Sequence, residues 1–222
     1  MSVRPSFSRR DSLFALAAAA GTLAGALSGC GRRQPRRGQP VAPGARVLAL
    51  GDSLTHGTGA PPDSAYPAVL AGLTGWEVVN AGVPGDVSAQ ALARLPGLLA
   101  GHQPALVLVG IGGNDLLRRS PEATLRENLR AMARAVQAAA AQALLIAVPR
   151  PTLSAAFTGR LDDHPLYAEV ADELALPLHA DGWSRVLADE RLRSDQIHAN
   201  AEGYRRFAEG LRDTLKRSGL LV

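Results

Sequence analysis

Short apolar runs alternate with longer amphipathic segments along most of this chain of 222 residues. Five of the runs are brief and aliphatic, which is typical of buried β-strands. The segments between them repeat their apolar positions with helical spacing. Alternation of this kind predicts βαβ units, and therefore an α/β fold with a mostly parallel sheet. The predicted strands are Arg46–Leu50, Trp76–Val79, Ala105–Val109, Ala143–Val148 and Leu176–His179.

Two of the predicted helices carry clear start signals. Ser120 and Pro121 stand before an acidic residue, as expected for an N-cap and a first helical position. Asn200 is placed to cap the last helix of the chain. The apolar stripes that follow predict the buried faces of these helices. They are Leu125, Leu129, Met132 and Val136 in the first helix, and Tyr204, Phe207, Leu211 and Leu215 in the second.

Polar residues follow three of the predicted strands. Asp52 and Ser53 come after the first strand, Asn80 and Gly82 close the second, and Asn114 follows the third. Any one of them is an ordinary turn residue, and Ser53 is also a suitable helix cap. Parallel strands, however, bring their carboxyl ends to one edge of the sheet, where ligands bind in open α/β folds. The three strand ends together predict a functional site.

Ser53 is a candidate nucleophile, and this chemistry requires a base and hydrogen-bond donors for a developing oxyanion. The candidate donors are the backbone N–H groups of Ser53 and Gly82 and the side-chain amide of Asn114. Asp195 stands three residues before His198 in a predicted loop, so its carboxylate can fold back onto the imidazole and fix its tautomer. We therefore predict His198 as the base and Asp195 as its partner.

The remaining histidines lack a local acidic partner of this kind. We expect His56, His102, His164 and His179 at the surface or in loops, and His56 is the least certain because it lies close to Ser53 in the sequence. The side chain of Asp52 is expected to brace the nucleophile turn.

The excess of positive charge belongs to the amino-terminal segment. Residues 1–46 contain eight arginines and one acidic residue, whereas the rest of the chain has 16 basic and 19 acidic residues. The isoelectric point near 10 therefore does not describe the folded domain. A nucleic-acid partner is not expected, because acidic residues outnumber basic ones in the rest of the chain.

The amino-terminal segment has the parts of a bacterial export signal. Arg9 and Arg10 resemble a twin-arginine signal, and the apolar segment that follows is too short to span a bilayer comfortably. It ends at Cys30, the only cysteine of the chain, in a pattern that resembles the lipobox of bacterial lipoproteins. We expect a signal peptide over residues 1–29, a flexible tether over 30–45 and one catalytic domain over 46–222.

This organisation predicts an exported protein that faces the periplasm. A lipid on Cys30 would attach it to a membrane, most readily the outer membrane. The alternative is an ordinary cleaved signal that leaves a soluble periplasmic or secreted protein.

Four sequence blocks together resemble the SGNH (GDSL) hydrolase family, in its bacterial arylesterase, thioesterase and lysophospholipase branch. In chain order they are Gly51-Asp52-Ser53-Leu54, Gly82, Gly113-Asn114-Asp115 and Asp195-Gln196-Ile197-His198. The resemblance implies a three-layer α/β/α sandwich of flavodoxin-like topology and ester hydrolysis that requires no metal or other cofactor. It also implies a triad of Ser53, His198 and Asp195, with Ser53, Gly82 and Asn114 as oxyanion donors. One difference is Ala199, where many relatives have a proline that would stiffen the loop.

The substrate is less well defined than the chemistry. Leu116 and Leu117 follow Asn114 and are candidates for contact with the acyl chain of a small-molecule or lipid ester. If both leucines pack into the core instead, a shallow site for acetyl groups remains, and an O-acetyl esterase of envelope polysaccharide is the alternative. A flavodoxin-like module that binds a phosphate or nucleotide at residues 52–59 is a function of a different class. It leaves Asp195 and His198 without a role, as does a catalytically silent lipoprotein scaffold.

Overall fold

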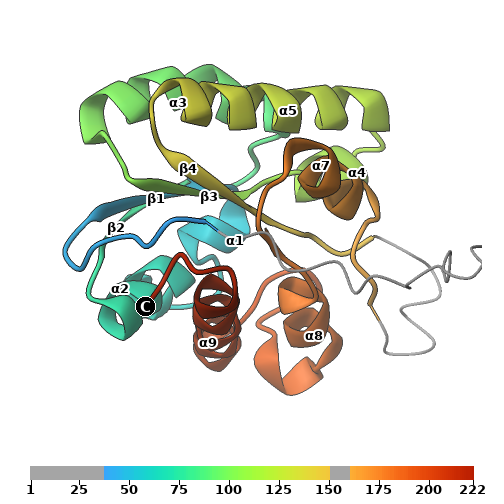
Figure 1. Ribbon diagram of the computed structural model, residues 1–222. Coiled ribbons are helices and arrows are strands. Elements are labelled where there is room, and N and C mark those ends of the chain that lie inside the picture. Colours follow the sequence, from blue (N-terminus) through green and yellow to red (C-terminus); the bar gives the residue numbers. More distant parts are fainter. Residues whose placement is uncertain (1–37, 151–160) are drawn as a thin grey trace, which may run out of the picture. The chain divides into compact units, whose positions relative to one another are not determined.

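The computed structural model describes residues 38–150 and 161–222 (Figure 1). The expected signal peptide, the arginine pair and Cys30 lie outside the described residues. Within them, all strand pairs are parallel, and the strand order is β2-β1-β3-β4-β5. This is the flavodoxin-like order of a doubly wound sheet. The strands are β1 (Arg46–Gly51), β2 (Glu77–Gly82), β3 (Leu106–Gly110), β4 (Gln142–Ile146) and β5 (Leu178–His179).

Helices cover both faces of the sheet, so the predicted three-layer α/β/α sandwich is confirmed (Figure 1). Helices α3 (Ser88–His102) and α5 (Glu122–Ala138) pack side by side on one face, and α7 (Leu166–Leu174) contacts α5. On the other face, α9 packs between α2 and α8. The bounds of the remaining helices are α1 Ser53–His56, α2 Tyr66–Thr74, α4 Gly113–Leu117, α8 Gly182–Ala188 and α9 Ala201–Arg217, with 3-10 turns at η1 Pro62–Ser64 and η2 Glu190–Leu192.

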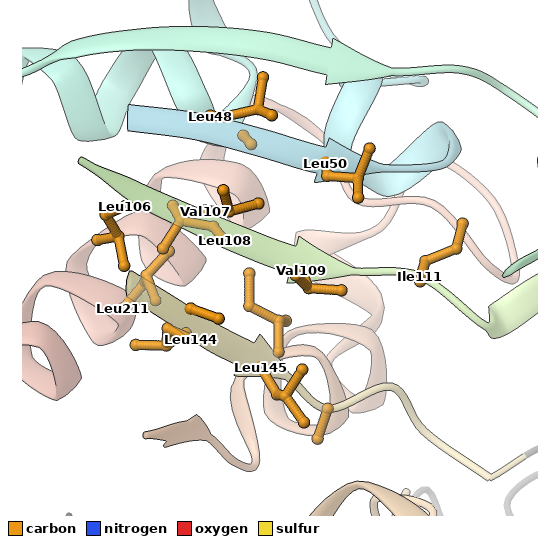
Figure 2. Close-up of a cluster of buried hydrophobic side chains, with 14 of the residues drawn as sticks. Leu48, Leu50, Leu106, Val107, Leu108, Val109, Ile111, Leu144, Leu145 and Leu211 are labelled. Atoms are coloured by element: carbon orange, nitrogen blue, oxygen red, sulfur yellow. The ribbon is translucent and has the colours of Figure 1, made fainter. Parts of the chain in front are cut away.

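The core lies between the sheet and its two helical layers. Figure 2 shows aliphatic side chains of β1, β3 and β4 packed together, with Leu211 of α9 among them. Both faces of the central strands are buried, and this explains why these strands read as continuous apolar runs rather than as alternating ones. Full burial of each such side chain contributes roughly 1.5–3 kcal/mol to the free energy of unfolding. The predicted apolar stripes of α5 and α9 are buried as expected.

The largest differences in length from the predicted strands are at β2 and β5. β2 continues to Gly82, because its last three residues still pair with β1, ending with Gly82 opposite Gly51. β5 is restricted to Leu178 and His179, the two residues that pair with the end of β4. Pairing with a neighbour, rather than local apolar content, sets both lengths.

The predicted cap of α5 is displaced by one residue. Pro121 takes the N-cap position and no side chain caps the helix, so Ser120 lies outside it. The Ser120 N–H donates instead to the carbonyl of Asp115. Asn200 does cap α9, where its side chain accepts a hydrogen bond from the Gly203 N–H at 3.0 Å.

The predicted tether extends too far toward the domain. Gly38 and Val41 donate backbone hydrogen bonds to Ser218 and Leu220, at 2.7 and 2.9 Å. The backbone of Gln39 exchanges two hydrogen bonds with the side chain of Gln142, and the Val41 side chain is buried. Residues 38–45 therefore belong to the folded domain, because Val41 is buried in the core and the backbone of this segment is bound to the carboxyl-terminal end of the chain. Over the described ranges, no helix is long and apolar enough to cross a membrane.

Candidate active site

Three strand ends meet at one edge of the sheet, as predicted. β1 lies between β2 and β3, and its last residue, Gly51, is in register with Gly82 on one side and Gly110 on the other. Ser53 follows β1 and Asn114 follows β3. The nucleophile turn is therefore central, with the candidate oxyanion residues on its two flanks.

The Ser53 turn is a helix start held by a buried acid. The carboxylate of Asp52 accepts a hydrogen bond from the Leu54 N–H at 3.0 Å and caps α1. Burial raises the pKa of Asp52 to about 6, although that hydrogen bond opposes the change. Ser53 is the first residue of α1, so its N–H has no hydrogen-bond partner within the helix and stands at the positive end of the helix dipole. Asp52 thus braces the loop, as expected.

A continuous chain of hydrogen bonds joins Ser53, His198 and Asp195. Ser53 Oγ lies 2.9 Å from His198 Nε2, and His198 Nδ1 lies 2.7 Å from Asp195 Oδ2. When the imidazole donates from Nδ1 to the carboxylate, Nε2 is left to accept the proton of the serine hydroxyl. Ser53 and His198 are 145 positions apart in the sequence, and only the fold brings them together.

The loop that carries His198 is organised by Asp195. Its second carboxylate oxygen accepts the backbone N–H groups of Ile197 and His198, each at 2.8 Å. Partial burial raises the pKa of Asp195, but the hydrogen bonds from His198 and these two amides outweigh it and hold the pKa below its ordinary value. The carboxylate therefore stays ionised beside the imidazole. Ala199 is buried directly after the histidine and pairs with Arg193, so the loop is held without the proline.

Asn114 and Asp115 tie the end of β3 to the loop before α3. The Asn114 side-chain amide donates one hydrogen bond to the backbone carbonyl of Asp86 at 3.0 Å. The buried Asp115 carboxylate accepts the Ser88 N–H at 2.8 Å and the Ser88 hydroxyl at 2.6 Å. An amide has two N–H donors, so Asn114 keeps one for an oxyanion. The Asp115 role was not predicted, although its place next to Asn114 was a usable signal.

Gly82 is placed for close packing. Its N–H donates to the side-chain oxygen of Asn80 at 3.0 Å, so this donor is engaged within β2. A Cβ atom at Gly82 would lie 2.1 Å from the backbone nitrogen of His56, so glycine is required where β2 approaches α1. Gly85 follows in the same turn, with a φ of +84°, next to the Asp86 carbonyl that Asn114 contacts.

The two candidate leucines have different environments. Leu116 is partly buried against the core, whereas 49% of Leu117 is exposed. Two further apolar residues next to the site are exposed, Val83 at 42% and Ile197 at 45%. Neither was predicted, although Ile197 directly precedes His198 and Val83 directly follows Gly82.

The expectation that the other histidines lie at the surface or in loops is wrong for His179, which is buried in a strand. His164 is also buried, but it lies in a loop. His179 lies in β5, with Nδ1 2.8 Å from Thr214 Oγ1, and burial lowers its pKa to about 4. His56 is exposed at the end of α1. In the part of the chain that the structure describes, no group of three or more histidine, cysteine, aspartate or glutamate side chains is arranged to hold a metal ion.

Comparisons with known proteins agree with this geometry. The GDSL-like lipase/acylhydrolase family matches residues 49–206. The thioesterase 1/protease 1/lysophospholipase L1 of Escherichia coli (strain K12) is 37% identical over 163 residues, which are 70% of this chain and 76% of that protein. The arylesterase of Vibrio mimicus is 30% identical over 172 residues, 74% of this chain and 84% of that protein.

Solved structures are similar over the same region. The crystal structure of TesA has a TM-score of 0.69 and 31% identity, and the match covers 77% of this chain and 98% of that one. The psychrotrophic esterase EstA from Pseudoalteromonas sp. has a TM-score of 0.68 and 25% identity, over 78% and 97% of the two chains. Because the family match spans well over half of the sequence, this chain belongs to the GDSL-like lipase/acylhydrolase family, the SGNH hydrolases.

Proposed function

We propose that this protein hydrolyses carboxylic esters and thioesters, such as aryl esters, acyl thioesters and lysophospholipids, through an acyl-enzyme on Ser53. The observation that carries the proposal is the Ser53–His198–Asp195 chain, with distances of 2.9 and 2.7 Å. His198 takes the hydroxyl proton as Ser53 attacks the carbonyl carbon, and it then protonates the leaving alcohol or thiol. Water, deprotonated by His198, releases the acid and restores the serine.

The oxyanion is stabilised by donors from both flanks of the nucleophile. We assign the Ser53 N–H and the second N–H of the Asn114 amide to this role. The sequence predicted Gly82 as the third oxyanion donor, but its N–H already donates to Asn80. We therefore assign this role to the turn at Gly85. That turn lies beside the carbonyl to which Asn114 is bound.

Labelling by a fluorophosphonate probe tests the nucleophile. Wild type should be labelled, and Ser53→Ala should be neither labelled nor active, because the probe forms its bond with an activated serine. Ser64→Ala is the matched control, since the hydroxyl of this serine donates to its neighbour Asp63 in η1 and takes no part in the Ser53–His198–Asp195 chain. Labelling or hydrolysis that persists in Ser53→Ala contradicts the proposal.

The exposed apolar residues support a substrate with an acyl chain. Val83, Leu117 and Ile197 lie in the segments that carry the turn after β2, the Asn114 helix and the base. We propose that they cover the chain of short to medium acyl groups, since each buried side chain contributes roughly 1.5–3 kcal/mol at most. Rates on p-nitrophenyl esters from acetate to palmitate should rise beyond acetate. Confinement to acetate would favour the O-acetyl esterase instead.

We propose further that the leader exports the protein and that Cys30 carries a lipid anchor, so that the enzyme faces the periplasm at the outer membrane. The support is the order of the arginine pair, the apolar segment and the single cysteine in the sequence. Each buried CH₂ of the lipid contributes about 0.8 kcal/mol to membrane binding. Cys30→Ser should release the protein from membrane fractions or block its processing. Unchanged fractionation with normal processing argues for a soluble periplasmic protein.

A further inference from the structure

Arg94 of α3 reaches back to the catalytic edge of the sheet. Its Nε donates to the carboxylate of Asp86 and its terminal NH₂ donates to the backbone carbonyl of Gly51, both at 2.8 Å. The two side chains are largely buried, with 24% of Arg94 and 9% of Asp86 exposed. Hydrogen bonds of a guanidinium to a carboxylate are among the stronger ones in proteins, and the planar fork fixes their direction.

The two acceptors belong to the two segments that carry the proposed reacting groups. Gly51 is the last residue of β1 and is followed by Asp52 and Ser53. Asp86 offers its side chain to Arg94 and its backbone carbonyl to the Asn114 amide. One guanidinium therefore links the nucleophile turn to the residue on which the oxyanion amide rests.

We infer that Arg94 is a positioning residue that sets the separation between the Ser53 N–H and the Asn114 amide, so that both point at the same oxyanion. In this role Arg94 acts through Gly51 and Asp86, which accept hydrogen bonds from two nitrogens of its guanidinium. The inference rests on the proposed function. Its physical basis is that misplacement of oxyanion donors by about 1 Å can cost about 100-fold in rate while substrate binding is little affected.

Arg46 provides a matched control at the opposite edge of the same sheet. It binds the carboxylate of Glu77 through two nitrogens at 3.0 Å and donates to the backbone carbonyl of His102, also at 3.0 Å. The chemistry is the same, a guanidinium shared between a carboxylate and a carbonyl. Arg46 stands at the first residue of β1, however, and the catalytic groups lie beyond its last. Its side chain is 40% exposed.

Steady-state kinetics of Arg94→Gln and Arg46→Gln on one p-nitrophenyl ester test the inference. Arg94→Gln should lower kcat by about 10–100-fold with KM changed less than about twofold. Arg94→Lys should recover only part of the loss, because an ammonium keeps the charge but not the fork. Arg46→Gln should leave kcat unchanged. An Arg94→Gln loss no greater than that of Arg46→Gln, or one confined to KM, overturns the inference.

A coupling measurement shows whether Arg94 acts through Asn114. In an Asn114→Ala background, Arg94→Gln should cost less than about threefold in kcat, because the donor that it positions is already absent. Full multiplication of the two losses overturns the inference. If Arg94→Gln does not fold, Arg94→Lys and Asp86→Asn are measured in the same cycle. Activity that survives Ser53→Ala contradicts the proposed function. If Ser53→Ala is inactive and Arg94→Gln is fully active, only the role of Arg94 is contradicted.

Discussion

Asp195 holds the imidazole of His198 while 54% of its own side chain remains exposed. The carboxylate achieves this with local contacts, because the two backbone amides that it accepts lie two and three residues further along the chain. A base held in this way needs no buried partner from another element. The structure therefore places the acid and the base of the site in a single short loop.

The proposed oxyanion donor on Asn114 should act in the transition state and not in the ground state. Asn114→Ala should lower kcat by about 10²–10³-fold with little change in KM, because the amide stabilises charge that develops on the carbonyl oxygen. Steady-state kinetics on a soluble ester check this. A loss that falls on KM alone would show that Asn114 binds the ground-state substrate.

The buried His179 makes stability depend on pH. Its folded pKa is about 4 and its ordinary value is 6.5, so between these values the unfolded chain binds the proton and the folded chain does not. The free energy of unfolding should therefore fall by about 3 kcal/mol as pH drops through this window. His179→Asn should remove that fall in urea titrations performed between pH 7 and pH 4. An identical pH profile for the variant would contradict the prediction.

Asp52 acts in the opposite direction over nearly the same window. Its folded pKa is raised from 3.8 to about 6, so the folded state binds the extra proton and gains stability as pH falls. The wild-type profile is thus the sum of two opposing groups. Asp52→Asn should make the acid-side fall steeper, and this separates the two contributions.

At the scale of elements, Asn200 connects the last helix to the catalytic loop. Its side-chain oxygen caps α9, and its amide donates to the carbonyls of Arg191 and Arg193 at 2.8 and 3.2 Å. Asn200→Ala should lower the free energy of unfolding by about 1–2 kcal/mol and should also lower kcat, because His198 loses its anchor to α9. Asn200→Ser should restore most of the stability, as measured by chemical denaturation, but not the rate. Recovery of both would show that only the cap matters.

At the scale of the whole molecule, the segment at residues 38–45 is part of the domain and lies away from the site. It binds Gln142, the first residue of β4, and the catalytic groups follow the opposite ends of the strands. A chain that begins at Arg46 should be less stable than one that begins at Gly38 by about 1.5–3 kcal/mol, chiefly from the loss of buried Val41. Its kcat and KM should be unchanged. Equal stability of the two chains in denaturant titrations would show that this segment belongs to the tether and not to the domain.

Local patterns in the sequence were sufficient to predict the three layers, the edge of the sheet that carries the site and the Asp195–His198 pair. The layers follow from βαβ units, and the acid reaches the imidazole within three residues, so these features depend on short stretches of chain. The apolar stripe of α9 was equally local, because helical spacing determines which of its side chains share one face.

Only the tertiary structure decided which residues are buried or closely packed against another element. The backbone of His56 leaves no room for a Cβ atom at Gly82, His179 is buried against α9, and Val41 is part of the core, because each of these outcomes depends on packing with another element. The same holds for Arg94, whose two acceptors are 8 and 43 positions away in the sequence. Packing between elements, which no local pattern encodes, determines where only glycine fits, which titratable groups are buried and how the two sides of the site are linked.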